Sequence, residues 1–208
     1  MKAKVEPVAL EAMFEQAIRR NPVAVAILER AGQLGMPNWY LGAGCLTQTV
    51  WNLAHGHEPT AYIRDYDLVY FDATDTSYEG EDAYIQAAKS LFADLHAEVE
   101  IRNEARVHLW FGRHFGYDIP PYESAEHAIT TWPTTATSVG VRAEGGRWRI
   151  YAPYGLEDAL SLVVRPNKGL VSQDVYEGKA ARWLAHWPQL TVLPWETASV
   201  SAETVRPL

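Results

Sequence analysis

The order of helix-forming and strand-forming segments is the feature that most constrains the fold of this chain. Through the first 116 residues, segments with a helical spacing of apolar residues alternate with short runs of residues typical of strands. Such alternation favours an α/β (α+β) fold, in which helices flank a mixed sheet. Helices are predicted at residues 8–20, 22–31, 45–56, 79–95 and 103–115, and strands at residues 39–41, 65–72 and 98–102.

The length of the chain, 208 residues, is that of one domain. We expect a core over residues 8–116 and a C-terminal extension over residues 117–208 that packs on the core, so that the two form a single compact unit. The extension opens with a stretch rich in proline and threonine. Its predicted elements are strands at residues 138–143 and 147–152, joined by a turn at Gly145-Gly146, and a last helix capped by Ser172.

Composition excludes several classes of protein. A single cysteine rules out a fold held by internal disulfides. The 26 acidic and 18 basic side chains give a net charge of −8, which disfavours non-specific binding to DNA. No apolar run approaches the roughly 20 residues that cross a bilayer, and the first residues lack the apolar segment of a signal peptide. We therefore expect no membrane association and a cytoplasmic location.

Two aspartates on one predicted strand are the first candidates for chemistry. Asp65 and Asp67 are two positions apart, so both side chains point to the same face, roughly 6.5–7 Å apart along the strand. Glu100 lies on the next predicted strand, where cross-strand neighbours approach within about 5 Å. Converging carboxylates repel one another, and a hard cation such as Mg²⁺ (or Mn²⁺) relieves that repulsion. The alternatives are a solvated strand end for the aspartates and surface ion pairs with Arg102 for Glu100 and its neighbour Glu98.

A glycine-containing turn precedes these acids. Gly42, Ala43, Gly44 and Cys45 lie between a predicted strand and the start of a helix. Glycines permit close approach of a ligand to the backbone, and the first N–H groups of a helix attract anions. The alternative is an ordinary tight turn. Together with the downstream carboxylates, an anion-binding turn indicates phosphoryl or nucleotidyl transfer.

On these segments the chain resembles the nucleotidyltransferase fold of the DNA polymerase β superfamily. More narrowly, it resembles a bacterial family of nucleotidyltransferase-like proteins, over about residues 9–187. The narrow resemblance is specific because several dissimilar segments occur in the right order. The segments are LGAGCLTQTVWN (41–52), RDYDLVYFD (64–72), VEIRNEARVHLWF (99–111), TTWPTTATSVGVR (130–142), YAPYGLEDAL (151–160) and VVRPN (163–167).

The resemblance implies a role for each matching residue. Asp65 and Asp67 would bind the catalytic metal, and Glu100 would be the third carboxylate of the superfamily. Gly44 and Cys45 fall on the glycine-serine pair that contacts nucleotide phosphate. The sequence departs from the family pattern in two ways, because a cysteine replaces the usual serine and the segment between Gly44 and Asp65 is longer than usual.

Further candidates lie in the rest of the chain. Arg102 can clamp a triphosphate, or form a salt bridge in this acidic protein. Thr135 belongs to a hydroxyl cluster that can line a nucleotide or acceptor pocket, or cap turns. Trp132 can stack on a base or be a buried indole. The pair His55 and His57 flanks a glycine after a predicted helix, which favours a helix-end turn over a metal site.

We therefore expect a metal-dependent nucleotidyltransferase that moves a nucleotidyl group from an NTP to an acceptor, which is a small molecule, a protein or RNA. The first alternative is a catalytically inactive protein of the same fold that binds a nucleotide or a partner. The second is a hydrolase with Cys45 as nucleophile and His108 or His114 as its base.

Overall fold

The computed structural model describes residues 6–197 and is built around a mixed sheet, as predicted. Five strands follow one another in the order β3-β2-β1-β4-β5. β2 and β3 are parallel, and the other neighbouring pairs are antiparallel. Two short parallel strands, β6 and β7, form a separate sheet. The strands are β1 (Tyr40–Gly42), β2 (Asp65–Tyr70), β3 (Glu98–Asn103), β4 (Gly140–Glu144), β5 (Arg147–Tyr151), β6 (Val163–Val164) and β7 (Thr191–Val192).

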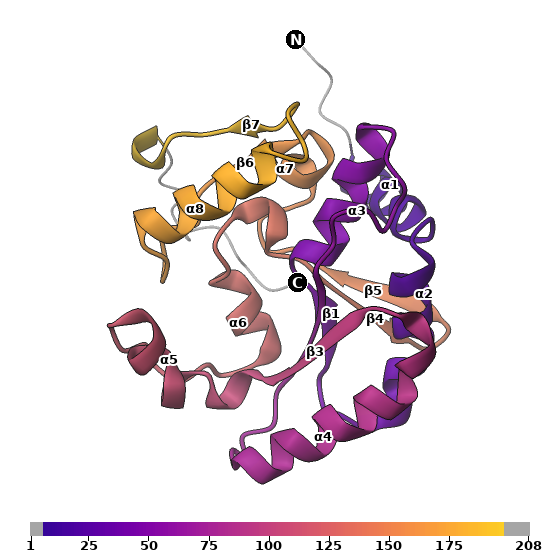
Figure 1. Ribbon diagram of the computed structural model, residues 1–208, viewed down its shortest axis with the longest axis vertical. Coiled ribbons are helices and arrows are strands. Elements are labelled where there is room, and N and C mark those ends of the chain that lie inside the picture. Colours follow the sequence, from indigo (N-terminus) through magenta and orange to yellow (C-terminus); the bar gives the residue numbers. More distant parts are fainter. Residues whose placement is uncertain (1–5, 198–208) are drawn as a thin grey trace.

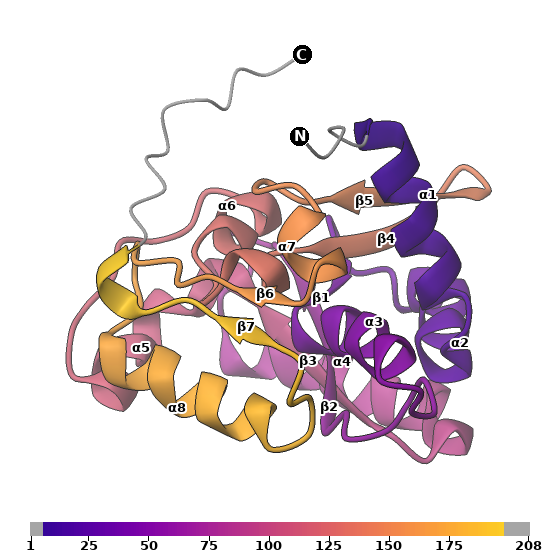
Figure 2. The same ribbon diagram turned by 90° about the horizontal axis from the view of Figure 1, so that it is seen from above.

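Helices surround this sheet (Figure 1). α4 packs against the edge strand β3. Figure 2 shows α8, β6 and β7 grouped on the side of the molecule opposite α2. The α-helices are α1 (Pro7–Ile18), α2 (Pro22–Arg30), α3 (Gly44–Ala54), α4 (Tyr78–Leu91), α5 (His108–Phe115), α6 (Ala125–Thr130), α7 (Glu157–Leu160) and α8 (Gln173–Leu184). Short 3₁₀ helices are η1 (Ala31–Leu34), η2 (Ala93–Leu95), η3 (Glu104–Arg106), η4 (Thr135–Thr137) and η5 (Trp195–Thr197).

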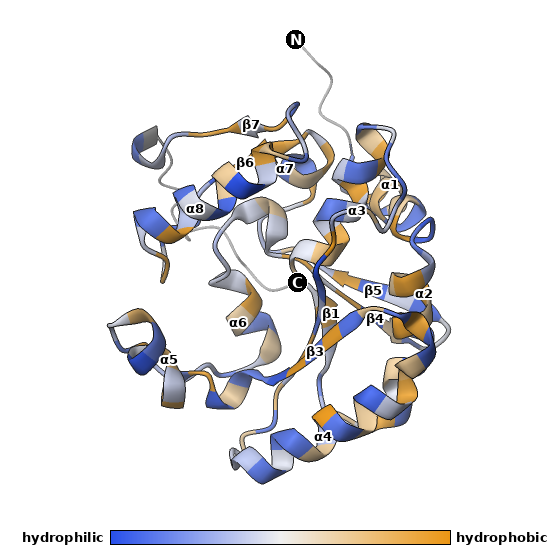
Figure 3. Ribbon diagram, in the orientation of Figure 1, coloured by the Kyte–Doolittle hydropathy of each residue, from blue (hydrophilic) through white to orange (hydrophobic). Residues whose placement is uncertain are grey.

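The two faces of β2 have different surroundings, because side chains alternate along a strand. Tyr66, Leu68 and Tyr70 enter the main core, which also contains buried residues of α1, α2, α3 and α4. On the other face, Val69 packs with Tyr40 and Ile129 in a smaller cluster. The surrounding helices are amphipathic, and Figure 3 shows apolar and polar residues succeeding one another along α4 and α8.

Local signals explain most element boundaries. The Asn21 side chain accepts hydrogen bonds from the backbone of Val23 and Ala24, as an N-cap does. Ser172 caps α8 by accepting from the backbone of Val175. Both glycines of the β4–β5 turn have positive φ, which confirms the predicted hairpin.

The predicted helix at residues 103–115 is wrong in one respect, because η3 and α5 replace a continuous helix. The Asn103 side chain accepts from the backbone of Asp72 and Ala105 and donates to the backbone of Asp72 and Asp75. These bonds tie the end of β3 to the loop after β2. The chain therefore makes a short 3₁₀ turn before it can enter α5.

The C-terminal extension is joined to the core in two ways. It supplies β4 and β5 to the main sheet. Its residues Trp183 and Trp187 pack edge-on against Trp51 of α3, with ring centres 5.3 and 5.5 Å apart. The Trp187 indole also donates to Asn52 at 2.8 Å. Trp39 is also buried in the main core, so core packing explains four of the eight tryptophans.

None of the helices in residues 6–197 is both long enough and apolar enough to cross a bilayer.

Candidate active site

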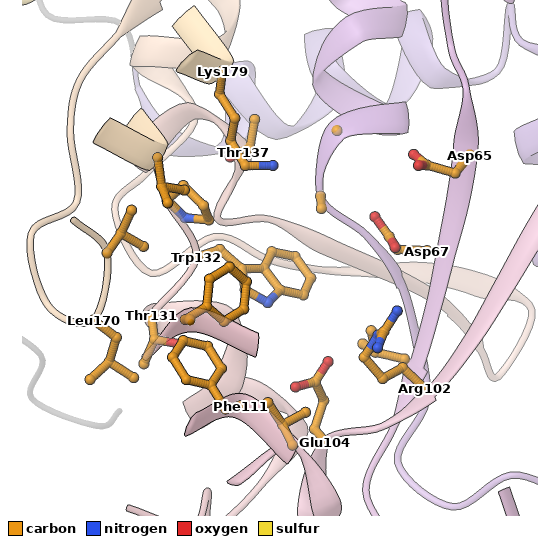
Figure 4. A pocket seen from close by; sticks show the side chains of 18 of the residues that line it. Asp65, Asp67, Arg102, Glu104, Phe111, Thr131, Trp132, Thr137, Leu170 and Lys179 are labelled. Carbon is orange, nitrogen blue, oxygen red and sulfur yellow. The ribbon is translucent and has the colours of Figure 1, made fainter. Parts of the chain in front are cut away.

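A cavity of about 450 Å³ lies between the main sheet and the C-terminal extension. This volume is within the usual range for small-molecule sites, roughly 300–1,000 Å³. Figure 4 shows polar side chains entering it from β2, from the end of β3 and from α8. The residues that carry its chemistry are Ala43, Gly44, Asp65, Asp67, Arg102, Glu104, Phe111, Tyr122, Thr131, Trp132, Thr137, Lys179 and Arg182.

Asp65 and Asp67 both line the cavity, as their spacing on one strand predicts. Their side chains point into it from β2 (Figure 4). Asp67 is partly exposed toward the cavity and is otherwise surrounded by protein. Burial, followed by the negative charges of Asp65 and Glu100, raises the pKa of Asp67 to about 7. An acid in this position is one whose negative form a cation would stabilise.

The chemistry of this pair fits a hard divalent cation. Both side chains offer only oxygen donors, which Mg²⁺ prefers. Neither carboxylate forms a hydrogen bond or ion pair with another residue in the part of the chain that the structure describes. Their oxygens are therefore available to a ligand in the cavity.

Glu100 lies beside Asp67 in the parallel ladder between β2 and β3. Its carboxylate forms an ion pair with Arg102 at 3.1 Å, and both side chains are over a third exposed. Of the two glutamates predicted to pair with Arg102, Glu100 is therefore the partner in residues 6–197, and Glu98 is not. Glu100 does not line the cavity. Within residues 6–197, no group of three or more acidic, histidine or cysteine side chains is placed to hold a metal ion.

The turn between β1 and α3 contributes its backbone to the cavity. Ala43 has φ +60° and ψ −132°, an uncommon conformation for a residue with a side chain. Ala43 and Gly44 line the cavity, and α3 begins at Gly44. Gly42 does not line it but permits a close contact, because a Cβ there would lie 2.4 Å from the ring of Trp132. The turn predicted to bind an anion therefore lies next to Asp67. Gly42 contributes to the cavity indirectly, because its lack of a side chain leaves room for the Trp132 ring that lines it.

Cys45 is placed differently from its predicted position in a nucleotide site. Its side chain is buried in the main core, and the thiol donates to the Gly42 carbonyl oxygen at 3.2 Å. Burial, with smaller effects from Asp67 and Asp65, raises the pKa of the thiol well above its usual value. A nucleophilic cysteine needs a lowered pKa and an accessible sulfur. The structure therefore contradicts the alternative of a Cys45-dependent hydrolase.

Lys179 of α8 is a cavity residue that the sequence did not single out. It lies across the cavity from Asp65 and Asp67 (Figure 4). Burial and the nearby Arg182 lower its pKa, whereas the two aspartates act in the opposite direction. The sequence does contain a pattern that predicts this position. Lys179 is four residues from both Val175 and Trp183, so the three lie on one face of α8, and all three line the cavity.

Glu104 is a second cavity residue that no sequence pattern indicated. It is 4% exposed and lines the cavity. Burial raises the pKa of Glu104 to about 8, with smaller and opposing effects from Arg102 on one side and Asp67 and Glu81 on the other. It follows Asn103, whose backbone N–H donates to Glu81 at 2.8 Å. Glu81 also pairs with Arg106, so the backbone on both sides of Glu104 is held in place.

The predicted nucleotide contact of Thr135 differs from what the structure shows. Its hydroxyl donates to Asp158 at 2.6 Å, and Thr135 does not line the cavity. Thr131 and Thr137 line it instead. Thr135 sits at the start of the 3₁₀ helix η4, whose tight turn directs it and Thr137 to different sides. The hydroxyl cluster also caps its own turn, because Thr134 accepts from the backbone of Thr137.

The two histidines after α3 form a helix-end turn, as expected. The His55 ring bonds to the Trp51 carbonyl oxygen at 2.8 Å, and the intervening Gly56 has positive φ. Arg102, by contrast, lines the cavity, where a side chain that clamps a triphosphate would have to lie, and it also forms the alternative salt bridge, with Glu100.

Residues 29–192 of the chain match the nucleotidyltransferase family. The chain belongs to this family. An NMR structure described as revealing a CCA-adding enzyme head domain is similar to this nucleotidyltransferase, with a TM-score of 0.71 and 27% sequence identity. The match covers 88% of this chain and 95% of that chain. Among curated proteins, no relative matches. The resemblance and the fold class inferred from the sequence are thereby confirmed.

Proposed function

We propose that this nucleotidyltransferase transfers a nucleotidyl group from an NTP to a hydroxyl group of an acceptor, with a divalent metal ion held by Asp65 and Asp67. The observation that carries the proposal is the pair of unpartnered carboxylates facing Lys179 across one cavity. In the reaction, the acceptor oxygen forms a bond to the α-phosphorus and the bond to pyrophosphate breaks. The bound Mg²⁺ or Mn²⁺ would neutralise charge that develops on the phosphate oxygens.

The end of the cavity that contains Asp65 and Asp67, here called the acidic end, also has groups that suit a triphosphate. The backbone of Ala43 and Gly44 and the start of α3 offer N–H groups to phosphate oxygens. Lys179 and Arg182 supply positive charge from the opposite wall. Glu100 lies next to Asp67 on the ladder but pairs with Arg102 outside the cavity lining, so the metal site is proposed on the two aspartates alone.

A smaller cavity of about 110 Å³ suggests where the acceptor enters. It shares Gln48, Asp65, Arg182 and Trp183 with the larger cavity. Its other lining includes Arg64 and the stacked rings of Tyr62 and His186, whose centres are 4.3 Å apart.

Cations beside stacking rings suit the end of an RNA strand, which carries both phosphate and bases. The similarity to a CCA-adding enzyme head domain supports the same class of acceptor. We therefore propose RNA rather than a protein or a small molecule. Binding through these few cations is local, and it is compatible with a net charge of −8.

Release of pyrophosphate from the four common NTPs tests the proposal. The assay is run with short RNA acceptors, with Mg²⁺ or Mn²⁺, and with chelator. We expect metal-dependent extension of the RNA, and a loss of about 1,000-fold or more in Asp65→Asn or Asp67→Asn, because electrostatic stabilisation of the transferring group is the main catalytic term.

The exposed Asp174→Asn variant is the matched control and should keep the wild-type rate. Nucleotide binding that persists in both aspartate variants, without turnover by the wild type, would instead support the inactive binding protein.

A further inference from the structure

One buried acid in the cavity has no role in the transfer step. Glu104 lies on the opposite side of the cavity from Lys179, and its carboxyl group points inward (Figure 4). The residue is 4% exposed, and its backbone carbonyl accepts from the Val107 N–H, but its carboxyl group has no hydrogen bond or ion pair with any residue of the described range 6–197. The carboxyl oxygens face the cavity and have no protein donor there among the described residues, so their hydrogen-bonding capacity is available to a molecule inside it.

Aromatic side chains form the walls around this carboxyl group. Trp132, Phe111 and Tyr122 line the same cavity. Trp132 is held from behind, since only a glycine at position 42 leaves room for its ring. Planar apolar walls favour a planar ring, and a single acid between them favours a ring with polar groups on its edge.

We propose that this aromatic end binds the base of the incoming nucleotide, with the ring against Trp132 and its polar edge hydrogen-bonded to Glu104. The inference rests on the proposed function, which places the triphosphate at the opposite, acidic end. Glu104 is thereby a base-binding residue and takes no part in bond formation.

The state of the acid determines what it can bind. With its pKa raised by burial, the Glu104 carboxyl group is mainly protonated at neutral pH and carries one donor and one acceptor. Each common base presents a donor beside an acceptor on its pairing edge. Glutamine has the same pair of groups in nearly the same shape, so Glu104→Gln should preserve the contact, whereas Glu104→Leu removes it and retains apolar volume.

The test measures dissociation constants by calorimetry for the wild type, Glu104→Gln and Glu104→Leu, all with Mg²⁺. The ligands are α,β-methylene analogues of ATP and of benzimidazole riboside triphosphate, together with inorganic tripolyphosphate. Benzimidazole keeps a flat ring but lacks the pairing edge, and tripolyphosphate lacks both ring and sugar. The variant Glu79→Leu, at an exposed position, is the matched control.

We expect Glu104→Leu to weaken binding of the ATP analogue at least about tenfold, because an unmatched base edge then faces an apolar wall. Glu104→Gln should stay within about threefold of the wild type, and no variant should change binding of the other two ligands by more than about threefold.

Two results would overturn the inference: unchanged binding of the ATP analogue by Glu104→Leu, or an equal loss for tripolyphosphate, which indicates a general structural defect. Absence of all nucleotide binding by the wild type overturns both proposals. The expected binding pattern without any transfer overturns the proposed function alone, and transfer without the pattern overturns this inference alone.

Discussion

The two ends of the cavity both contain acidic side chains, but their surroundings differ. At the acidic end, Asp65 and Asp67 share one strand face, with Glu100 beside them on the ladder and Lys179 opposite. At the aromatic end, Glu104 is a single acid among ring-bearing side chains. The first arrangement concentrates negative charge, and the second isolates one polar group in apolar surroundings.

The difference shows in what raises each pKa. Burial is the largest cause for both Asp67 and Glu104. At Asp67 the next causes are like charges, which a cation would relieve. At Glu104 the next cause is Arg102, which lowers the pKa and so opposes burial. A metal ion therefore suits the first site, and a neutral polar ligand suits the second.

After the substitution of either aspartate, the largest effect is expected from the positive charge of Lys179 at the acidic end. Lys179→Met should lower the transfer rate by about 100-fold, because one preorganised charge on the transferring phosphate is lost. The loss should be equal for all NTPs and should extend to binding of tripolyphosphate, in contrast to Glu104→Leu.

Steady-state kinetics with each NTP measures this effect, and the exposed Lys89→Met is the control. If Lys179→Met lowered the transfer rate for some NTPs much more than for others, Lys179 would contact the base, and the assignment of phosphate and base to opposite ends of the cavity would be wrong.

Stability should depend on pH through both acids. In the folded protein Asp67 and Glu104 have pKa values of about 7 and 8, above their ordinary values, so the folded state holds protons that the unfolded state releases. The free energy of unfolding is then greatest near pH 4 and falls as pH rises. We expect a decrease of several kcal/mol, on the order of 5, between about pH 4.5 and 8.

Chemical denaturation across this range measures the decrease. Glu104→Gln should remove part of the slope with or without metal. Mg²⁺ should remove the part that depends on Asp67, and should have no such effect in Asp67→Asn. A slope that is identical in all three proteins would refute the assignment of raised pKa values to these two acids.

The smallest effect is expected at Cys45. Its thiol is buried against the Gly42 carbonyl oxygen, outside the cavity. Cys45→Ala should keep the transfer rate within about threefold, and should cost about 1 kcal/mol of stability through the lost packing. Rate measurements and thermal unfolding test this directly. If Cys45→Ala lost activity while its stability was unchanged, the conclusion that Cys45 has no role in the active site would be wrong.

Local patterns were sufficient for the acidic end. The alternation of side chains on a strand placed Asp65 and Asp67 on one face, and the glycine turn was correctly placed between a strand and a helix. Patterns failed where a short segment is shaped by distant contacts. The helices α6 and α7 and the strands β6 and β7 are short, and their periodicity is too brief to detect.

The choice of polar residues shows the same limit. Thr135 and Thr137 are equivalent in the sequence, but η4 turns one toward Asp158 and the other toward the cavity. Spacing could not distinguish Glu104 from other acids, because its burial follows from the contacts of Asn103 and Glu81 with neighbouring segments.

The class of fold, the family resemblance and the paired aspartates could all be predicted from the amino-acid sequence, because they depend on local periodicity and on the order of segments. The tertiary structure was needed to see that Lys179 faces the aspartates, that Trp132 rests on Gly42, and that the Glu104 carboxyl group has no hydrogen-bond partner among residues 6–197. The physical reason is that burial and electrostatic environment depend on which distant segments pack together. A residue's own neighbours in the chain do not contain that information.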